Sequence, residues 1–111
     1  MEETYLFIDT ETTGFFKSGS LIQDGQARVC QIAMLLTDSN GKHLAEFSCL
    51  VKPDGWTISQ GASDIHGFTD ELCEQYGMPF KDMLAVYGHF VSRATRIVAH
   101  NSEFDKKMRL S

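Results

Sequence analysis

The sequence predicts an α/β fold that runs strand, strand, strand, helices, strand and helix. Three observations support this prediction. Apolar residues alternate with other residues in early segments, an Asn-Gly turn at residues 39–42 separates two of these segments, and helix-start signals follow the break at Pro53-Asp54-Gly55. A chain of 111 residues with 42% hydrophobic residues has room for one core. We therefore expect a single domain over residues 1–111.

The three early strands are bounded by turn residues. They are expected at residues 4–11, 29–37 and about 43–51. A loop with two glycines, residues 15–27, separates the first strand from the second. Residues 39–42 supply the chemistry of a hairpin turn, so the second and third strands should be neighbours.

Helices follow the third strand. Residues 59–65 suit a short helix, Thr69 is a good N-cap for a second helix through about Tyr76, and Pro79 opens a third that runs to about Ala94. Residues 97–100 then read as a short buried strand, followed by a helix that begins at Asn101 or Ser102.

Composition limits the class of protein. The net charge of −5 argues against a general nucleic-acid coat protein, which is normally basic. Apolar runs are too short to span a membrane, and the Met-Glu-Glu start lacks the basic segment of a signal peptide. Cys30, Cys49 and Cys73 form neither a CxxC pair nor a zinc pattern. We therefore expect a cytoplasmic protein with reduced thiols.

The first strand carries two acids near its end, in the run Ile8-Asp9-Thr10-Glu11. Because side chains alternate along a strand, Asp9 and Glu11 should point to one face, roughly 7 Å apart at about 3.3 Å per residue. Carboxylates this close repel unless a cation lies between them, and Mg²⁺ or Mn²⁺ suits hard oxygen ligands. The alternative is a pair of solvated acids; the apolar run before them and the Thr-Thr-Gly after them favour a metal site.

Residues 12–14 follow the acids directly. Gly14 permits a sharp turn or the close approach of another molecule, because it has no Cβ. Thr12 and Thr13 offer hydroxyl and backbone N–H groups that could receive phosphate oxygens beside the metals. Taken alone, Thr-Thr-Gly also suits an ordinary loop.

A second constellation lies at residues 96–109. In the expected helix, Asn101, Phe104 and Asp105 share one face with Met108. An acid beside two apolar residues indicates that this face meets a charged partner. Alternatively, Ser102 and Asp105 approximate a capping box, in which the acid complements the helix dipole.

Together, residues 8–14 and 100–105 resemble the first two motifs of the DEDD (DnaQ-like) 3′→5′ exonuclease family. Residues 58–69, which contain Ile65-His66-Gly67-Phe68-Thr69, are similar to another segment of that family. The resemblance covers residues 4–110. It implies a ribonuclease H-like fold, in which three antiparallel strands and one parallel strand form a mixed sheet with flanking helices.

The sequence departs from the family pattern in one respect. Family members carry a third motif, His-x-x-x-x-Asp or Tyr-x-x-x-Asp, which supplies a fourth carboxylate and the general base. The present sequence ends at Ser111, before such a motif. The expectation from sequence is therefore an incomplete exonuclease-like domain, with Asp9, Glu11 and Asp105 as three of four metal ligands and catalytic acids.

The resemblance implies phosphodiester hydrolysis with two divalent ions, Mg or Mn. Asp9 and Glu11 would hold one ion, Asp9 and the missing acid would hold the other, and Asp105 would act through a metal-bound water. Without the general base the rate should fall, on the order of 10²–10⁴-fold.

The implied substrate is a single-stranded DNA or RNA 3′ end, and a DNA polymerase subunit is a candidate partner. His66 could contact a base or sugar, although an isolated histidine often has a structural role. Phe104 could stack on the terminal base or pack in the core. Basic residues near the second motif could track phosphates or simply be exposed helix residues. The substrate-binding candidates are Thr12, Thr13, Gly14, His66, Asn101 and Phe104.

Three hypotheses follow from the sequence. The chain is a piece of a longer exonuclease, or it is a catalytically impaired domain that binds metal or 3′ ends without cleavage, or a second chain completes its site. We expect the first, an exonuclease domain of the kind used in replication and proofreading.

Overall fold

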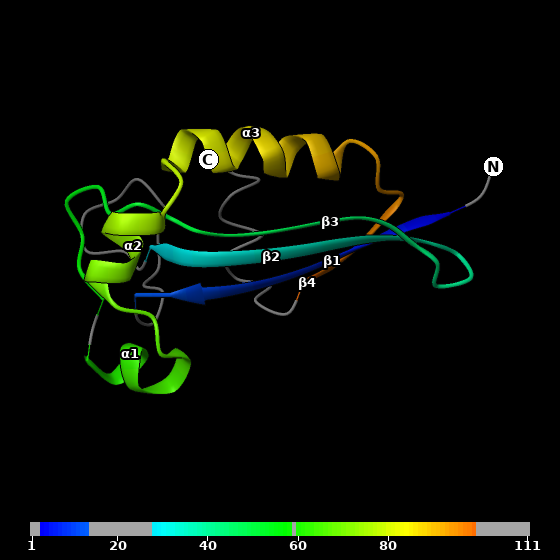
Figure 1. Cartoon of the computed structure of the whole chain (residues 1–111). Helices are drawn as coiled ribbons and strands as arrows, with labels where there is room; N and C mark the ends of the chain where they lie inside the picture. The colour runs from blue at the N-terminus through cyan, green and yellow to red at the C-terminus, as the bar shows by residue number, and fades with distance from the viewer. Residues whose placement is uncertain (1–2, 14–27, 59, 100–111) are drawn as a thin grey trace, which may run out of the picture.

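The computed structural model describes residues 3–13, 28–58 and 60–99. Their elements appear in the predicted order (Figure 1). The bounds are β1 Thr4–Thr12, β2 Val29–Asp38, β3 His43–Leu50, α1 Gln60–His66, α2 Asp70–Tyr76, α3 Phe80–Val91 and β4 Arg96–Ala99. The helix expected after residue 100 lies outside the described residues.

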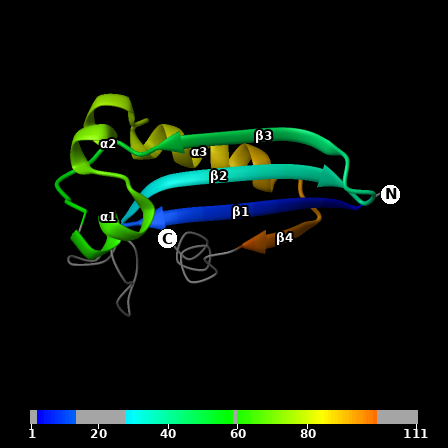
Figure 2. The same ribbon diagram turned by 60° about the horizontal axis from the view of Figure 1, so that its bottom comes forward.

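The strands form one mixed sheet in the order β3-β2-β1-β4. β2 pairs antiparallel with both β1 and β3, whereas β4 pairs parallel with β1. Figure 2 shows the short β4 beside β1, with both arrows pointing the same way. The expectation of three antiparallel strands plus one parallel strand is confirmed, and the first strand is a central one.

The hydrophobic core lies between the sheet and α3. Alternate residues of β1 and β2, among them Leu6 and Ile32, are fully buried, as is Met83 of α3. Figure 1 shows α3 lying along one face of the sheet. Each fully buried side chain of this size contributes about 1.5–3 kcal/mol relative to an exposed one. This packing explains why the period of two in the sequence predicted β1 and β2 correctly.

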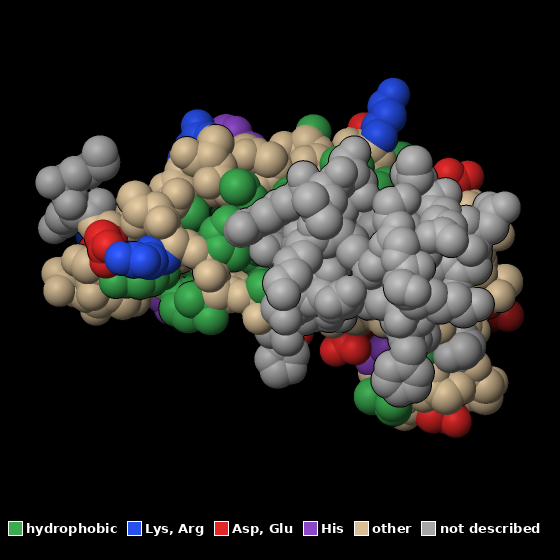
Figure 3. Space-filling view, turned by 180° about the vertical axis from the view of Figure 1, so that it is seen from behind, with side chains coloured by type: hydrophobic (Ala, Val, Ile, Leu, Met, Phe, Trp, Pro, Cys, Tyr) green, Lys and Arg blue, Asp and Glu red, His purple; other side chains and the backbone are tan. Residues whose placement is uncertain are grey.

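Some large hydrophobic side chains are exposed. Phe7 and Val98, which are paired in register on β1 and β4, are 42% and 47% exposed. Figure 3 shows hydrophobic side chains at the surface on one side of the molecule. Phe7 alternates along β1 with the buried residues Leu6 and Ile8. Its side chain therefore lies on the face of the sheet that points away from the core.

α3 ends three residues before the expected Ala94. Ser92 closes the helix, with its N–H donating to the carbonyl oxygens of Gly88 and Phe90. The chain then turns towards β1, where the N–H of Thr95 donates to the carbonyl oxygen of Thr4 at 3.0 Å. Pairing with β1 therefore ends the helix earlier than local sequence signals suggested. None of the helices in the described residues is both long enough and apolar enough to cross a membrane.

Candidate active site

Asp9 and Glu11 lie on the face of β1 that points away from the core. Leu6, Ile8 and Thr10 are buried, while Asp9 is exposed and Glu11 is partly exposed. The two acids pair in register with Ala33 and Gln31 of β2. The prediction that the two carboxylates share one face of a strand is therefore confirmed by this alternation.

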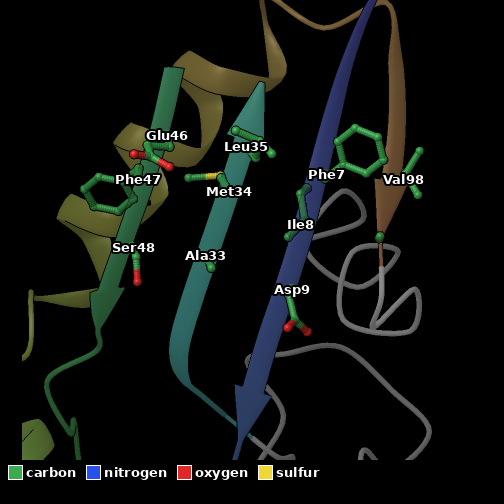
Figure 4. Close-up of a pocket in the computed structure, with 11 residues that line it drawn as sticks. Phe7, Ile8, Asp9, Ala33, Met34, Leu35, Glu46, Phe47, Ser48 and Val98 are labelled. Carbon is green, nitrogen blue, oxygen red and sulfur yellow. The ribbon is translucent and has the colours of Figure 1, made fainter. Parts of the chain in front are cut away.

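Asp9 also lines an open pocket of about 910 Å³ on the sheet. Figure 4 shows Asp9 on β1, in the pocket that Phe7, Ser48 and Val98 also line. Ala99, the last residue of β4, completes this side of the pocket. An acid is thus accessible at the position where the first and last strands of the described sheet meet.

The parallel pairing of β4 with β1 places the carboxyl end of β4 at the acids. Ala99 pairs with Ile8, so the chain leaves the sheet next to Asp9. The second motif begins at the very next residue of the sequence. Asp105, Asn101, Phe104 and Gly14 lie outside the described residues, so their convergence on Asp9 stays a prediction.

The end of β1 is irregular. Glu11 pairs with Gln31 but Thr12 pairs with Val29, which leaves Cys30 as the extra residue of a bulge in β2. The thiol of Cys30 donates to the carbonyl oxygen of Glu11 at 3.4 Å. The side chain of a bulge residue therefore holds the backbone of a candidate metal ligand.

His66, the last residue of α1, lies at the same end of β1. Its Nε2 is 3.1 Å from the carbonyl oxygen of Thr12, and its Nδ1 accepts from the N–H of Phe68 at 3.0 Å. Figures 1 and 2 show α1 beside the tip of the β1 arrow. Both ring nitrogens thus face backbone atoms of this chain. His66 therefore lies at the end of β1 that carries the acids, and its predicted contact with a base or sugar stays a prediction.

Thr13 is buried and bonded to the start of β2. Its N–H donates to the carbonyl oxygen of Arg28 at 2.8 Å, and its Oγ1 accepts from the N–H of Arg28 at 2.9 Å. The first of these bonds uses the backbone N–H of Thr13, which was expected to receive a phosphate oxygen. Thr12 precedes it, partly exposed at the end of β1.

Burial controls the thiols behind the acids. Removal from water, with smaller contributions from Cys73, Glu11 and Asp70, raises the pKa of the Cys30 thiol to about 12. Burial likewise raises the pKa of Cys73, whose thiol donates to the carbonyl oxygen of Cys30 at 3.7 Å. Cys30 is therefore a protonated donor at neutral pH. No pattern in the sequence indicates this role, because only the bulge brings Cys30 to Glu11.

The donors present fit a hard divalent cation. Asp9 and Glu11 offer accessible carboxylate oxygens on one face of a strand, which is the chemistry that Mg²⁺ and Mn²⁺ prefer. Within residues 3–13, 28–58 and 60–99, no cluster of three His, Cys, Asp or Glu side chains could hold a metal.

Comparisons with known proteins agree with this arrangement. The family model RNase T, described as Exonuclease, matches residues 6–109. A search of the curated proteins gave no match. Members of the DEDD exonuclease family typically use divalent metal ions.

The solved structures that are similar to this chain include several of exonuclease I. One, a structure of exonuclease I that suggests how processivity is achieved, has a TM-score of 0.77 and 24% identity, and the match covers 96% of this chain and 22% of that chain. Another, from Methylocaldum szegediense, has a TM-score of 0.78 and 18% identity, with 96% and 22% covered. The E. coli enzyme in complex with a 5cy-dA13 oligonucleotide has a TM-score of 0.77 and 24% identity, again with 96% and 22% covered.

These likenesses confirm the ribonuclease H-like fold, and the chain spans less than a quarter of those exonuclease I chains. The family model accounts for nearly the whole sequence, including both acids of β1. The chain therefore belongs to the DEDD exonuclease family.

Proposed function

We propose that this chain is a 3′→5′ exonuclease domain that removes nucleotides from single-stranded nucleic-acid 3′ ends. The observation that carries the proposal is the parallel pairing of β4 with β1, in which Ala99, the residue before the second motif in the sequence, pairs with Ile8, the residue before the exposed Asp9. Membership of the exonuclease family supports the reaction type. An exonuclease I in complex with an oligonucleotide supports the substrate class.

In this proposal Asp9 and Glu11 are the catalytic acids of β1 and would hold two Mg²⁺ or Mn²⁺ ions together with Asp105. When bound, such ions stabilise the charge that develops on the phosphate during in-line displacement. Thr12, Gly14 and Asn101 would bind the terminal nucleotide, and the buried Thr13 would hold the end of β1 against Arg28. The phenyl ring of Phe104 would stack on the last base.

The accessible face of Asp9 explains how a 3′ end could reach the acids. The pocket beside Asp9 is open and partly apolar, with Phe7 and Val98 along one side. Sugar and base surfaces can pack against such side chains, while the phosphate meets the carboxylate end. A polymerase partner and a cytoplasmic location are parts of the proposal that depend on the sequence alone.

The test is metal-dependent release of mononucleotides by the 111-residue chain. Single-stranded DNA and RNA labelled at the 3′ end would be incubated with Mn²⁺ or with EDTA. We expect release in Mn²⁺ and none in EDTA. Asp9→Asn should reduce the rate by more than about 100-fold, because even residues that only orient a metal ligand cost about 10–100-fold.

Asp82→Asn is the matched control. Asp82 is exposed on α3, which packs against the core face of the sheet, so the substitution makes the same change of side chain away from the pocket and the acids of β1. This variant should keep the wild-type rate. Metal-dependent binding of the labelled strand without release would identify the binding-only alternative. Release that persists in EDTA or in Asp9→Asn would overturn the proposal.

A further inference from the structure

The last carbonyl groups of β1 are held by side chains from other elements. The bulge at Cys30 interrupts the regular pairing between Glu11 and Thr12. Buried or partly buried backbone oxygens require hydrogen-bond donors, and an interrupted ladder supplies fewer of them. Here the thiol of Cys30 donates to the carbonyl oxygen of Glu11, and Nε2 of His66 contacts the carbonyl oxygen of Thr12. Both contacts lie directly behind the strand that presents the two acids.

The hydrogen bonds of His66 determine which nitrogen carries its proton. The backbone N–H of Phe68 can only donate, so the Nδ1 that receives it must be the unprotonated nitrogen of a neutral ring. The proton therefore lies on Nε2, which is the nitrogen 3.1 Å from the Thr12 oxygen. The assignment follows from the partners of the ring and needs no external group.

The backbone after α1 is shaped to make this arrangement possible. Gly67 has a φ of +79°, in the left-handed region, and its N–H donates to the carbonyl oxygen of Ser63 at 2.7 Å. This turn brings the N–H of Phe68 back to the ring of His66, and the two rings pair with centroids 5.3 Å apart. The turn at the end of α1 thus fixes the orientation of the imidazole ring that contacts β1.

Cys30 restrains the same nitrogen from the other side. Its sulfur is 3.8 Å from Nε2 of His66 and 3.4 Å from the Glu11 oxygen. The side chain is fully buried, and the carbonyl oxygen of Cys30 accepts from the N–H of Val51 at 2.8 Å. The contact joins α1, β1 and β2 at one point behind the acids.

We propose that His66 is a positioning residue, which holds the carbonyl group of Thr12 through its Nε2–H and, by fixing the backbone directly after Glu11, orients the Glu11 carboxylate for metal binding. This inference rests on the proposed function, since it concerns the same acids. The Thr12 oxygen belongs to the peptide group between Thr12 and Thr13, so losing this contact would free the backbone directly after Glu11 and let the Glu11 side chain move relative to Asp9. Groups that orient metal ligands typically change metal affinity by about 10–100-fold when they are removed.

Two substitutions separate the contact made by Nε2 of His66 from the contact made by its Nδ1. His66→Gln keeps an amide N–H near the position of Nε2 but loses the acceptor for Phe68, whereas His66→Asn keeps an acceptor near Nδ1 but cannot reach the Thr12 oxygen. The measurement is the dissociation constant for Mn²⁺, from the electron paramagnetic resonance signal of the free ion. We expect His66→Asn to weaken binding by about 10–100-fold. We expect His66→Gln to stay near wild type.

Val86→Ala controls for loss of stability. Val86 is partly buried on α3 and packs against the core, away from the acids. The unfolding free energy of each variant would be measured in urea beside its Mn²⁺ affinity. A purely structural role of His66 predicts that His66→Asn and Val86→Ala lose stability and keep their affinity for Mn²⁺. That result would overturn the proposal.

The tautomer can be tested in the wild-type protein, without any variant. Long-range ¹H–¹⁵N correlation spectra distinguish a proton on Nε2 from one on Nδ1. A proton on Nδ1 would overturn the proposal, because Nε2 would then have none to donate to Thr12.

The proposed function fails separately. If Asp9→Asn binds Mn²⁺ as wild type does, the acids of β1 hold no metal and both proposals fall. If Asp9→Asn loses binding while His66→Asn keeps it, only the role of His66 is refuted.

Discussion

Gly77 occupies a position where no side chain fits. It follows α2 and precedes Met78, which forms a bridge with Val51. A Cβ at residue 77 would lie 2.6 Å from the carbonyl carbon of Val51, and closer still to the backbone oxygen of Cys73 and the backbone nitrogen of Lys52. These are backbone atoms, so rotation of a side chain cannot relieve the overlap.

The cost of Gly77→Ala follows from the contacts that would have to move. Carbon atoms normally approach to about 3.5–4.0 Å. The backbone around residue 77 must therefore move by about 1 Å away from each of these three atoms. The shift strains the bonds from Gly77 N–H to Cys73 O at 2.8 Å and from Lys52 N–H to Met78 O at 2.9 Å. Overpacking costs about 1–3 kcal/mol and each weakened hydrogen bond about 0.5–1.5 kcal/mol, which gives a total of about 2–6 kcal/mol.

The assay is urea denaturation followed by far-ultraviolet circular dichroism. Gly88→Ala provides the matched control, because Gly88 lies in α3 with nothing within 4 Å of its added Cβ. This control should stabilise the protein by about 0.8–1 kcal/mol through helix propensity. A loss below about 0.5 kcal/mol in Gly77→Ala, the range of ordinary surface substitutions, would refute the packing argument.

The same substitution should reach the acids. Val51 donates its N–H to the carbonyl oxygen of Cys30 at 2.8 Å, and Cys30 holds the Glu11 carbonyl. A displaced Val51 therefore disturbs the bulge behind β1. We expect Gly77→Ala to bind Mn²⁺ more weakly than Gly88→Ala under conditions in which both remain folded.

Three further predictions concern charge, pH and the pairing of β1 with β4. Asp9→Asn should stabilise the metal-free protein in EDTA by about 0.6 kcal/mol, the repulsion of two charges about 7 Å apart in water; a lower midpoint in urea than wild type would contradict this. The raised pKa of Cys30, about 12 against an ordinary 9.0, means that its thiol is neutral in both states below pH 9. Above that pH the unfolded chain ionises first, so by about pH 10.5 wild type should lose about 2 kcal/mol more unfolding free energy than Cys30→Ala. Parallel losses in the two proteins would argue against the shift. Thr95→Val should destabilise the fold by about 1–2 kcal/mol, because Oγ1 of Thr95 accepts from the N–H of Thr4 and donates to its carbonyl oxygen; an unchanged melting temperature would show that these bonds contribute nothing.

Local signals in the sequence were sufficient for most of the fold. Alternation in residues 4–11 predicted which face of β1 carries the acids, and Thr69 caps α2 as expected, with its hydroxyl accepting from the N–H of Leu72 at 3.2 Å. Such signals depend on neighbours within a few residues. The predicted end of α3, at about Ala94, lies beyond the observed end at Val91, because pairing between residues 95 and 4 overrides helix propensity.

The supports of the candidate site could not be predicted in this way. His66 reaches Thr12 across 54 residues, and Cys30 reaches Glu11 across 19 residues through a bulge that leaves no mark on the sequence pattern. From the sequence, His66 could either contact a base or sugar or have a structural role. Only the positions of its two ring nitrogens relative to backbone atoms indicate that His66 holds the end of β1.

The pairing of the first strand with the last described one constrains how the molecule assembles. Thr4 and Thr95 are bonded across 91 residues, so the sheet closes only after the chain has been made as far as β4. Contacts between such distant segments impose a large loop-closure entropy and slow the folding of a small domain. During synthesis, a nascent chain would already expose the carboxylates of β1 while β4 was still within the ribosome. The sheet that presents Asp9 and Glu11 would therefore be completed only when translation had passed β4.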